Sequence, residues 1–162
     1  MQEVCLNVQR SILEIPTDAT GKVFGIVLPT AKELTKDGLM LCDQYDTNLA
    51  AKYFKIDRVA SEYYKKYGAR VFYLGAVKNP SNGVMKLFNF PIKNSIKDKT
   101  DATVVSQSCE QLLSTIEKFK VDCCLLPFFG ADLGITSFAN CIRPIMDVMF
   151  DERFIMVHRK EN

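Results

Sequence analysis

The chain has 162 residues, of which 48% are hydrophobic and 25% charged. This is typical of one globular domain with its own core, and it is unlike a disordered or membrane-spanning protein. The 21 basic and 19 acidic side chains give a net charge of +2, which offers no electrostatic reason to expect a nucleic acid or a membrane surface as a partner. The opening MQEVCLNVQRSILEI lacks the pattern of a secretion signal, so we expect a single soluble domain over residues 1–162 in the cytoplasm.

The cysteine and histidine pattern predicts neither disulfides nor a metal site. The chain has six cysteines but no C-x-x-C pair, and its only histidine is His158. A zinc site needs several Cys or His ligands at compatible spacing. We therefore expect reduced, packed thiols, with no metal and no other cofactor.

Short apolar runs alternate with segments of helical periodicity along the chain. Strands separated by helices require crossover connections, so the pattern predicts an α/β fold with a largely parallel or mixed sheet. Richness in Val, Ile, Phe and Leu is typical of strands that are covered on both faces. The expected strands are residues 4–13, 22–28, 70–77, 84–90, 121–127 and 153–158.

Helical periodicity is clearest over residues 101–120, where apolar side chains recur at spacings of three and four. Residues 48–54 and 58–67 form a second helical region, and residues 137–150 form a third, in which Pro144 must kink the helix or mark a boundary. The hairpin turn expected between the third and fourth strands contains Pro80, Asn82 and Gly83.

The second helical region and the strand after it are rich in tyrosines and basic residues. Such a mixture can contact the bases and phosphates of a nucleic acid, but a half-exposed amphipathic helix also explains it, and at this net charge we favour the helix. The residues concerned are Tyr63, Tyr64, Tyr67, Tyr73, Lys65, Lys66 and Arg70.

The segment VDCCLLPFFGADLGITSF, residues 121–138, joins an apolar strand to a helix through a loop with Gly130 and Gly134. In an open α/β sheet such loops gather at the carboxyl edge, where glycines let backbone amides approach a phosphate and the helix N-terminus favours negative charge. The segment therefore predicts a pyrophosphate site, although loop glycines are more often plain turn residues. Phe128 and Phe129 either stack on a base or ribose or pack in the cleft wall.

Three other segments extend this pattern: IVLPTAKELTKDGLMLCDQYDTNLAAKYF, LFNFPIKNSIKDKTDATVVSQSCEQLL and MFDERFIMVHRKEN. Together with the glycine loop they resemble the macro-domain family, in particular small members from bacteria and their viruses, over residues 23–158. The positions that match are Thr30, Lys36, Asp37, Gly38, Lys52, Phe54, Phe90, Pro91, Lys93, Asp101, Ser108, Pro127, Gly130, Gly134, Asp151, Arg153 and Phe154.

The resemblance implies a three-layer α/β/α sandwich around a mixed, largely parallel sheet. Macro domains bind ADP-ribose or its derivatives at the carboxyl edge of that sheet, and some hydrolyse ADP-ribose phosphate or ADP-ribosyl linkages. Asp18 stands where many members have an acidic residue that reads the adenine amino group, although it is also a typical turn former. Lys93 either contacts a phosphate or is a solvated surface lysine.

This chain departs from the family pattern in both loops that hold the nucleotide. Ala31 replaces an asparagine that helps to orient the distal ribose, and Asp43 and Tyr45 stand where the first loop has Gly-x-Gly. Asp132 and Ile135 replace two glycines of the second loop. The added side chains narrow both loops, and carboxylates repel a pyrophosphate, so these departures favour binding over catalysis.

No residue pattern identifies a catalytic group. A nucleophilic Cys or Ser needs a nearby base, and the one histidine lies on the expected last strand. Hydrolysis in the family can instead work by positioning a water molecule, but the replaced asparagine and glycines argue against it. We assign no catalytic residue.

The sequence favours a divergent macro-type domain that recognises or sequesters ADP-ribose or a related nucleotide. One alternative is a hydrolase of ADP-ribose phosphate or ADP-ribosyl linkages, and another is a ligand-free protein-interaction domain. Virus-associated members suggest a host or partner protein, whereas no membrane and no nucleic acid is expected as a partner. The residues expected to bind the ligand are Asp18, Thr30, Asp43, Tyr45, Lys93, Phe128, Phe129, Gly130, Ala131, Asp132, Gly134 and Ile135.

Overall fold

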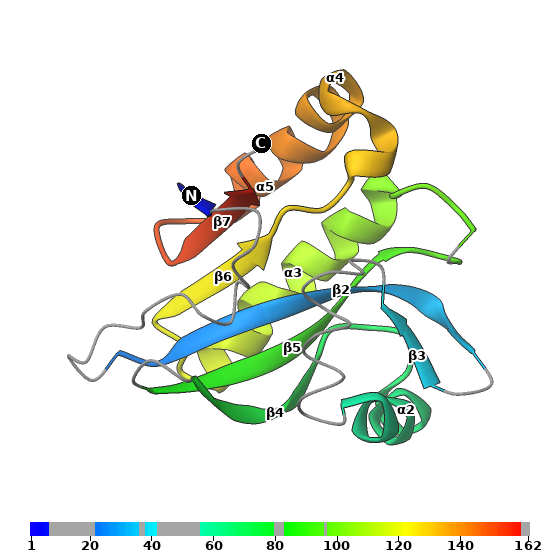
Figure 1. Cartoon of the computed structure of the whole chain (residues 1–162), viewed down its shortest axis with the longest axis vertical. Coiled ribbons are helices and arrows are strands. Elements are labelled where there is room, and N and C mark those ends of the chain that lie inside the picture. The colour runs from blue at the N-terminus through cyan, green and yellow to red at the C-terminus, as the bar shows by residue number, and fades with distance from the viewer. Residues whose placement is uncertain (7–21, 36–37, 42–55, 80–82, 96, 160–162) are drawn as a thin grey trace.

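A computed structural model of the chain describes residues 1–6, 22–35, 38–41, 56–79, 83–95 and 97–159 (Figure 1). The strands are β1 (Gln2–Leu6), β2 (Phe24–Thr35), β3 (Gly38–Leu41), β4 (Phe72–Asn79), β5 (Gly83–Lys93), β6 (Cys123–Pro127) and β7 (Phe154–Arg159). The helices are α2 (Ile56–Tyr67), α3 (Ala102–Lys118), α4 (Ile135–Ser137) and α5 (Arg143–Met149), with a 3₁₀ turn at Ala131–Leu133 and a π-helical turn at Phe138–Ile142. Within these ranges, no helix is both long enough and apolar enough to cross a membrane.

The strands form one seven-stranded sheet in the order β1-β7-β6-β2-β5-β4, and β3 pairs with β2. The pairings from β1 through β5 along this order are parallel, while β3 and β4 each pair antiparallel with their neighbour. The predicted mixed, largely parallel sheet is confirmed. Because the parallel strands run in one direction, the carboxyl ends of β2, β5, β6 and β7 lie at the same edge of the sheet (Figure 1).

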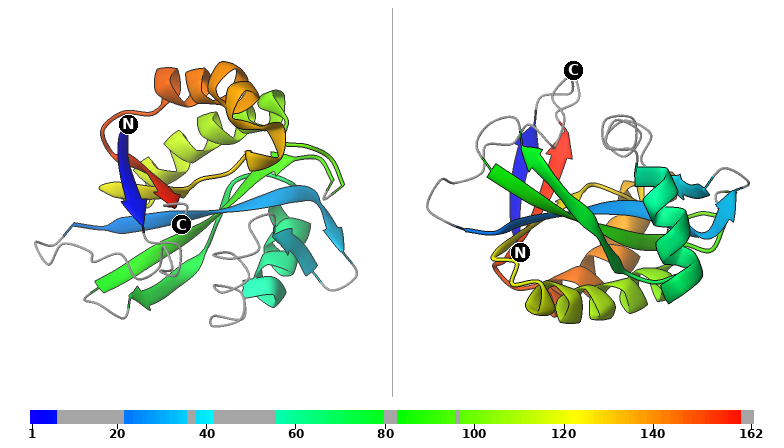
Figure 2. Two further views of the ribbon diagram at one scale, coloured as in Figure 1. Left: turned by 45° about the horizontal axis from the view of Figure 1, so that its top comes forward. Right: turned by 90° about the horizontal axis from the view of Figure 1, so that it is seen from below.

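Both faces of the sheet carry core residues, as the apolar strands predict. In β5, Phe88 and Phe90 belong to the core beneath α3 and α5, and the alternate residues Met85 and Leu87 belong to the core on the face that α2 covers. This alternation follows from the two-residue period of a strand. Figure 2 shows α3 and α5 on one side of the sheet and α2 on the other, which confirms the three-layer α/β/α arrangement.

Helix α3 matches the prediction for residues 101–120 to within two residues at each end. Asp101 caps it, because its carboxylate accepts hydrogen bonds from the backbone N–H groups of Thr103 and Val104 at 2.9 and 3.1 Å. Fully buried residues at helical spacing then face the sheet, namely Val105, Cys109, Leu112 and Ile116. The buried stripe explains why this amphipathic segment is a helix.

The third predicted helical region is a continuous helical run from α4 through the π-helical turn to α5. Pro144 lies in the first turn of α5. Since proline has no backbone N–H, it cannot donate the hydrogen bond that a regular helix would make to the residue four positions earlier. The boundary that Pro144 predicts is therefore present, directly after the π-helical turn Phe138–Ile142.

Strand β2 is longer than the sequence predicted, because it continues through Pro29 to Thr35 and turns back as β3. The strand predicted from the sequence ended at residue 28. A proline is disfavoured inside a sheet, but Pro29 is here part of β2. Thr35 of β2 is the register partner of Gly38 of β3. The helix predicted over residues 48–54 lies outside the described residues, as does much of the first strand predicted over residues 4–13.

Candidate functional site

The carboxyl edge of the sheet brings together three segments that the sequence singles out. On β2 and β5, Ala31 is the register partner of Lys93. On the other side of β2 in the sheet order, β6 ends at Pro127, whose register partner is Val157 of β7. The loop after β6 therefore begins at the same edge as the ends of β2 and β5.

The loop after β6 depends on two glycines with left-handed backbone conformation. Gly130 has φ of +89° and Gly134 has φ of +81°, a region that L side chains rarely adopt. A Cβ atom on Gly130 would lie 2.9 Å from the ring of Phe138, whereas one on Gly134 would meet nothing within 4 Å. At Gly130, both the backbone conformation and the packing against Phe138 therefore require a glycine. At Gly134, the backbone conformation alone does so.

The helical run after this loop begins without a side-chain cap. Gly134 occupies the cap position of α4 and offers no side-chain acceptor, unlike Asp101 at the start of α3. The first N–H groups of a helix have no partner within the helix, and the helix dipole places partial positive charge at this end. The first N–H groups of this helical run therefore receive no side-chain cap.

The carboxylate of Asp132 is held by Thr100, the second residue before α3. Its two oxygens accept hydrogen bonds from the backbone N–H and the hydroxyl of Thr100, both at 2.8 Å. The sequence predicted that this side chain contributes unfavourable charge to the phosphate path. These two hydrogen bonds orient the carboxylate of Asp132 toward Thr100.

The aromatic side chains of the loop lie in two different environments. Phe129 is buried and lies 5.7 Å, ring centre to ring centre, from Phe90. Phe128 is half-buried, with ring centres 4.8 Å from Phe138 and 5.3 Å from His158. Phe129 therefore packs in the core, the second of the two roles that the sequence left open, and Phe128 retains partly accessible ring surface.

Three more of the predicted binding residues differ in burial. Thr30 is fully buried and donates a hydrogen bond of 2.7 Å to the Asn89 side chain. Lys93 is only 9% exposed, so most of its side chain is packed, and no described residue pairs with its ammonium. Ile135 is 85% exposed, so its side chain does not fill the space at the edge.

Three predicted residues, Asp18, Asp43 and Tyr45, lie outside the described residues, and so does the side chain of Ala131. The first nucleotide loop, to which Asp43 and Tyr45 were assigned, thus stays a prediction. The second loop, from Phe128 to Ile135, is the part of the site whose geometry is described.

The described cysteines give no activated nucleophile in the sheet and helix core. Burial raises the pKa of the Cys109 thiol to about 12, and burial also raises the pKa of Cys124 strongly. The thiolate is the reactive form, so these two groups are inert at neutral pH. Among the residues that the structure describes, no group of three His, Cys, Asp or Glu side chains could hold a metal ion.

The fold has solved counterparts. The chain has a TM-score of 0.57 to the macrodomain of Thermus aquaticus DarG, with 17% identity over 98% of this chain and 99% of that one. It has a TM-score of 0.57 to the Mycobacterium tuberculosis DarG macrodomain, with 11% identity and the same coverage. The chain has the macrodomain fold.

A third structure, of Thermosipho africanus DarTG in complex with ADP-ribose, has a TM-score of 0.63 and 12% identity over 84% of this chain and 38% of that one. No protein-family model and no curated protein matches the sequence. The structural similarity shows the fold that the macro-domain resemblance implies.

Several positions that carried the resemblance make contacts within the fold. Ser108 on α3 donates a 2.6 Å hydrogen bond to the carbonyl of Pro91 on β5. Arg153 binds Asp151 through both side-chain nitrogens Nε and Nη2 just before β7, and these bonds lower the pKa of the Asp151 carboxyl. This pair precedes β7 and therefore lies at the opposite edge of the sheet from the glycine loop.

Sequence analysis missed the part that Thr100 plays at the site. Thr100 is buried and anchors the loop through Asp132. Its position directly before the capping residue Asp101 was the available signal, because loops that precede helices in parallel α/β sheets gather at the carboxyl edge.

Proposed function

We propose that this macrodomain-fold chain binds ADP-ribose or a related nucleoside diphosphate at the carboxyl edge of its sheet. The observation that carries the proposal is the loop after β6 at the carboxyl edge of the sheet, in which Gly130 and Gly134 both have left-handed backbone conformation. Backbone N–H groups in such a loop and at a helix start are suited to a diphosphate. The ADP-ribose complex of the structurally similar Thermosipho africanus DarTG supports the same ligand class.

The diphosphate would lie against the loop between Gly130 and Gly134 and the first turn of α4. Lys93 would face the ligand from β5, because its ammonium has no partner among the described residues and is free to pair with an anion. The accessible part of the Phe128 ring would pack against ribose or base. The remaining predicted contacts, Asp18, Asp43 and Tyr45, complete the proposal from the sequence.

Recognition or sequestration is the proposed role. The Asp132 carboxylate would be the nearest general base in the described loop, but Thr100 occupies both of its oxygens. The buried thiols of Cys109 and Cys124 stay protonated. A binding protein would leave ADP-ribose phosphate unchanged, and release of inorganic phosphate from that compound would show that the hydrolase alternative is correct.

The test compares two exposed apolar residues on the helical run. Ile135 is 85% exposed in the first turn and Val148 is 86% exposed near the end, about 20 Å further along a helix that rises 1.5 Å per residue. Ile135→Glu places a carboxylate beside the proposed diphosphate, so calorimetry with ADP-ribose should show at least about tenfold weaker binding. Val148→Glu adds the same charge and should bind as the unchanged chain does.

Acidic residues in the first turn of a helix are favourable to the helix, so Ile135→Glu should leave the thermal midpoint unchanged or raise it. Equal affinity in the two variants would refute the placement of the diphosphate. No heat of binding with the unchanged chain across ADP-ribose, ADP and NAD would refute the ligand class.

A further inference from the structure

A hollow lies on the lateral edge of the sheet, at the edge strand β4. It has a volume of about 510 Å³, within the range of small-ligand pockets. In the sheet order, β2 and β5 separate β4 from β6 and its glycine loop. This hollow, which we name the β4 pocket, is therefore distinct from the proposed ADP-ribose site.

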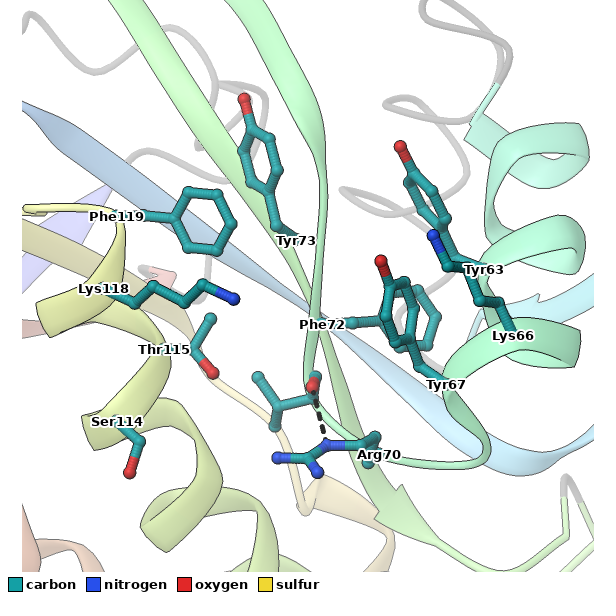
Figure 3. Close-up of a pocket in the computed structure, with 11 residues that line it drawn as sticks. Tyr63, Lys66, Tyr67, Arg70, Phe72, Tyr73, Ser114, Thr115, Lys118 and Phe119 are labelled. Carbon is teal, nitrogen blue, oxygen red and sulfur yellow. Dashed lines mark hydrogen bonds between the residues drawn. The ribbon is translucent and has the colours of Figure 1, made fainter.

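The β4 pocket has two walls, one on each side of the edge strand (Figure 3). Successive side chains of a strand point to opposite faces, so Phe72 faces α2 while Val71 and Tyr73 face α3. Tyr67 of α2 lines one wall, and Phe119, which follows α3, lines the other (Figure 3). A ligand in the pocket would touch both helices across the strand.

Among the lining residues that the structure describes, the formally charged ones are all basic, namely Lys66, Arg70 and Lys118. All three residues are exposed, and none forms an ion pair with another residue in the part of the chain that the structure describes. In Figure 3, Lys118 extends from α3 toward β4, and the guanidinium of Arg70 turns toward the same wall. The pocket is thus complementary to an anion.

Each wall pairs an aromatic ring with an ammonium group. The Nζ atom of Lys66 lies 5.1 Å from the ring centre of Tyr67, and that of Lys118 lies 5.9 Å from the ring centre of Phe119. Tyr67 is 48% exposed, so part of its ring is open to a ligand. The ring of Phe119 packs against the ring of Tyr73, with ring centres 4.4 Å apart.

We propose that the β4 pocket binds a nucleotide, either free or as one unit of a single strand. The base would pack on Tyr67 or Phe119, and its phosphate would lie near Lys66, Arg70 or Lys118. Aromatic platforms combined with a basic groove are the usual means of holding bases without sequence preference. An acidic peptide would use the cations but not the rings, so the aromatic contribution separates these two occupants.

Fluorescence anisotropy with labelled ten-residue oligothymidylate tests the proposal, with unlabelled thymidine monophosphate as competitor. Lys66→Gln, Lys118→Gln and Tyr67→Leu should each weaken binding at least about fivefold, the last because leucine keeps apolar bulk but gives no ring for stacking. Lys65→Gln is the matched control, since Lys65 is exposed on the same helix and does not line the pocket. Binding should also weaken as salt is raised.

Competition by the monophosphate at similar concentration would indicate a free nucleotide, and binding of the oligonucleotide alone would indicate a strand; both outcomes support the proposal. Ile135→Glu should leave the affinity unchanged, which distinguishes this pocket from the ADP-ribose site. No binding of either probe overturns the proposal. It is also overturned if Lys65→Gln weakens binding as much as Lys66→Gln, or if oligoglutamate displaces the probe and Tyr67→Leu has no effect.

Discussion

The Asp132 side chain receives two hydrogen bonds of 2.8 Å from Thr100, one from its backbone N–H and one from its hydroxyl. The contact links the loop after β6 to the segment before α3, 32 positions earlier in the chain. Asp132 therefore anchors the loop after β6 to the segment before α3.

Asp132→Ala should lower the free energy of unfolding by about 1–3 kcal/mol, because it leaves the buried N–H of Thr100 without its acceptor. Thr100→Val, which removes only the hydroxyl, should cost about 0.5–1.5 kcal/mol. Urea denaturation of both variants and of the double variant measures the coupling between them. Fully additive losses would show that the two side chains do not interact.

Gly130→Ala should lower the free energy of unfolding by at least about 2 kcal/mol. Alanine disfavours the left-handed backbone at this position, and its Cβ atom would crowd the ring of Phe138. Phe138→Leu replaces the crowding ring by a smaller side chain. In that background Gly130→Ala should therefore cost less than in the unchanged chain. Thermal or urea unfolding of the four variants gives the comparison, and an equal cost in both backgrounds would contradict the contact.

The packing of α3 predicts opposite outcomes for neighbouring leucines. Leu112 is fully buried and Leu113 only partly buried. Leu112→Ala should cost about 2–5 kcal/mol through lost burial and a cavity, whereas Leu113→Ala should cost clearly less. Urea denaturation gives both values, and the reverse order would place the other face of α3 against the sheet.

Stability should fall at high pH because of the buried thiols. The pKa of Cys109 is about 12 in the folded chain against 9.0 for a free thiol, so the unfolded chain loses this proton first. The contribution is fully present below pH 9 and is lost between pH 9 and 12, at about 1.4 kcal/mol per pH unit. Urea denaturation at several pH values should show a shallower decline for Cys109→Ala, which lacks this proton; identical slopes would contradict the assigned burial.

Much of the fold was predictable because the periodicity of apolar residues in the sequence matches the burial of their side chains in the structure. The apolar period of α3 and the boundary at Pro144 each have a direct structural counterpart. The hairpin of β4 and β5 is also present, with Asn79 paired to Gly83. These features depend on residues close in sequence, where propensity and periodicity are informative.

The site was less predictable because its geometry depends on contacts between distant segments. The sequence identified the glycine loop, but it could not show that Thr100 holds Asp132 or that Lys93 is buried. The cluster of tyrosines and basic residues was interpreted as an amphipathic helix face, and most of it lines the β4 pocket together with residues of α3. The composition of α2 alone does not show which residues of α3 line the other wall of the pocket.

The most direct test of the central claim is a titration of ¹⁵N-labelled protein with ADP-ribose, followed residue by residue by two-dimensional NMR. The account predicts saturable shifts that are largest for the amides of Gly130, Gly134 and Ile135, with little change at Tyr67 and Lys118. Saturable shifts confined to Tyr67 and Lys118, or none at the glycine loop at millimolar ligand, would contradict it.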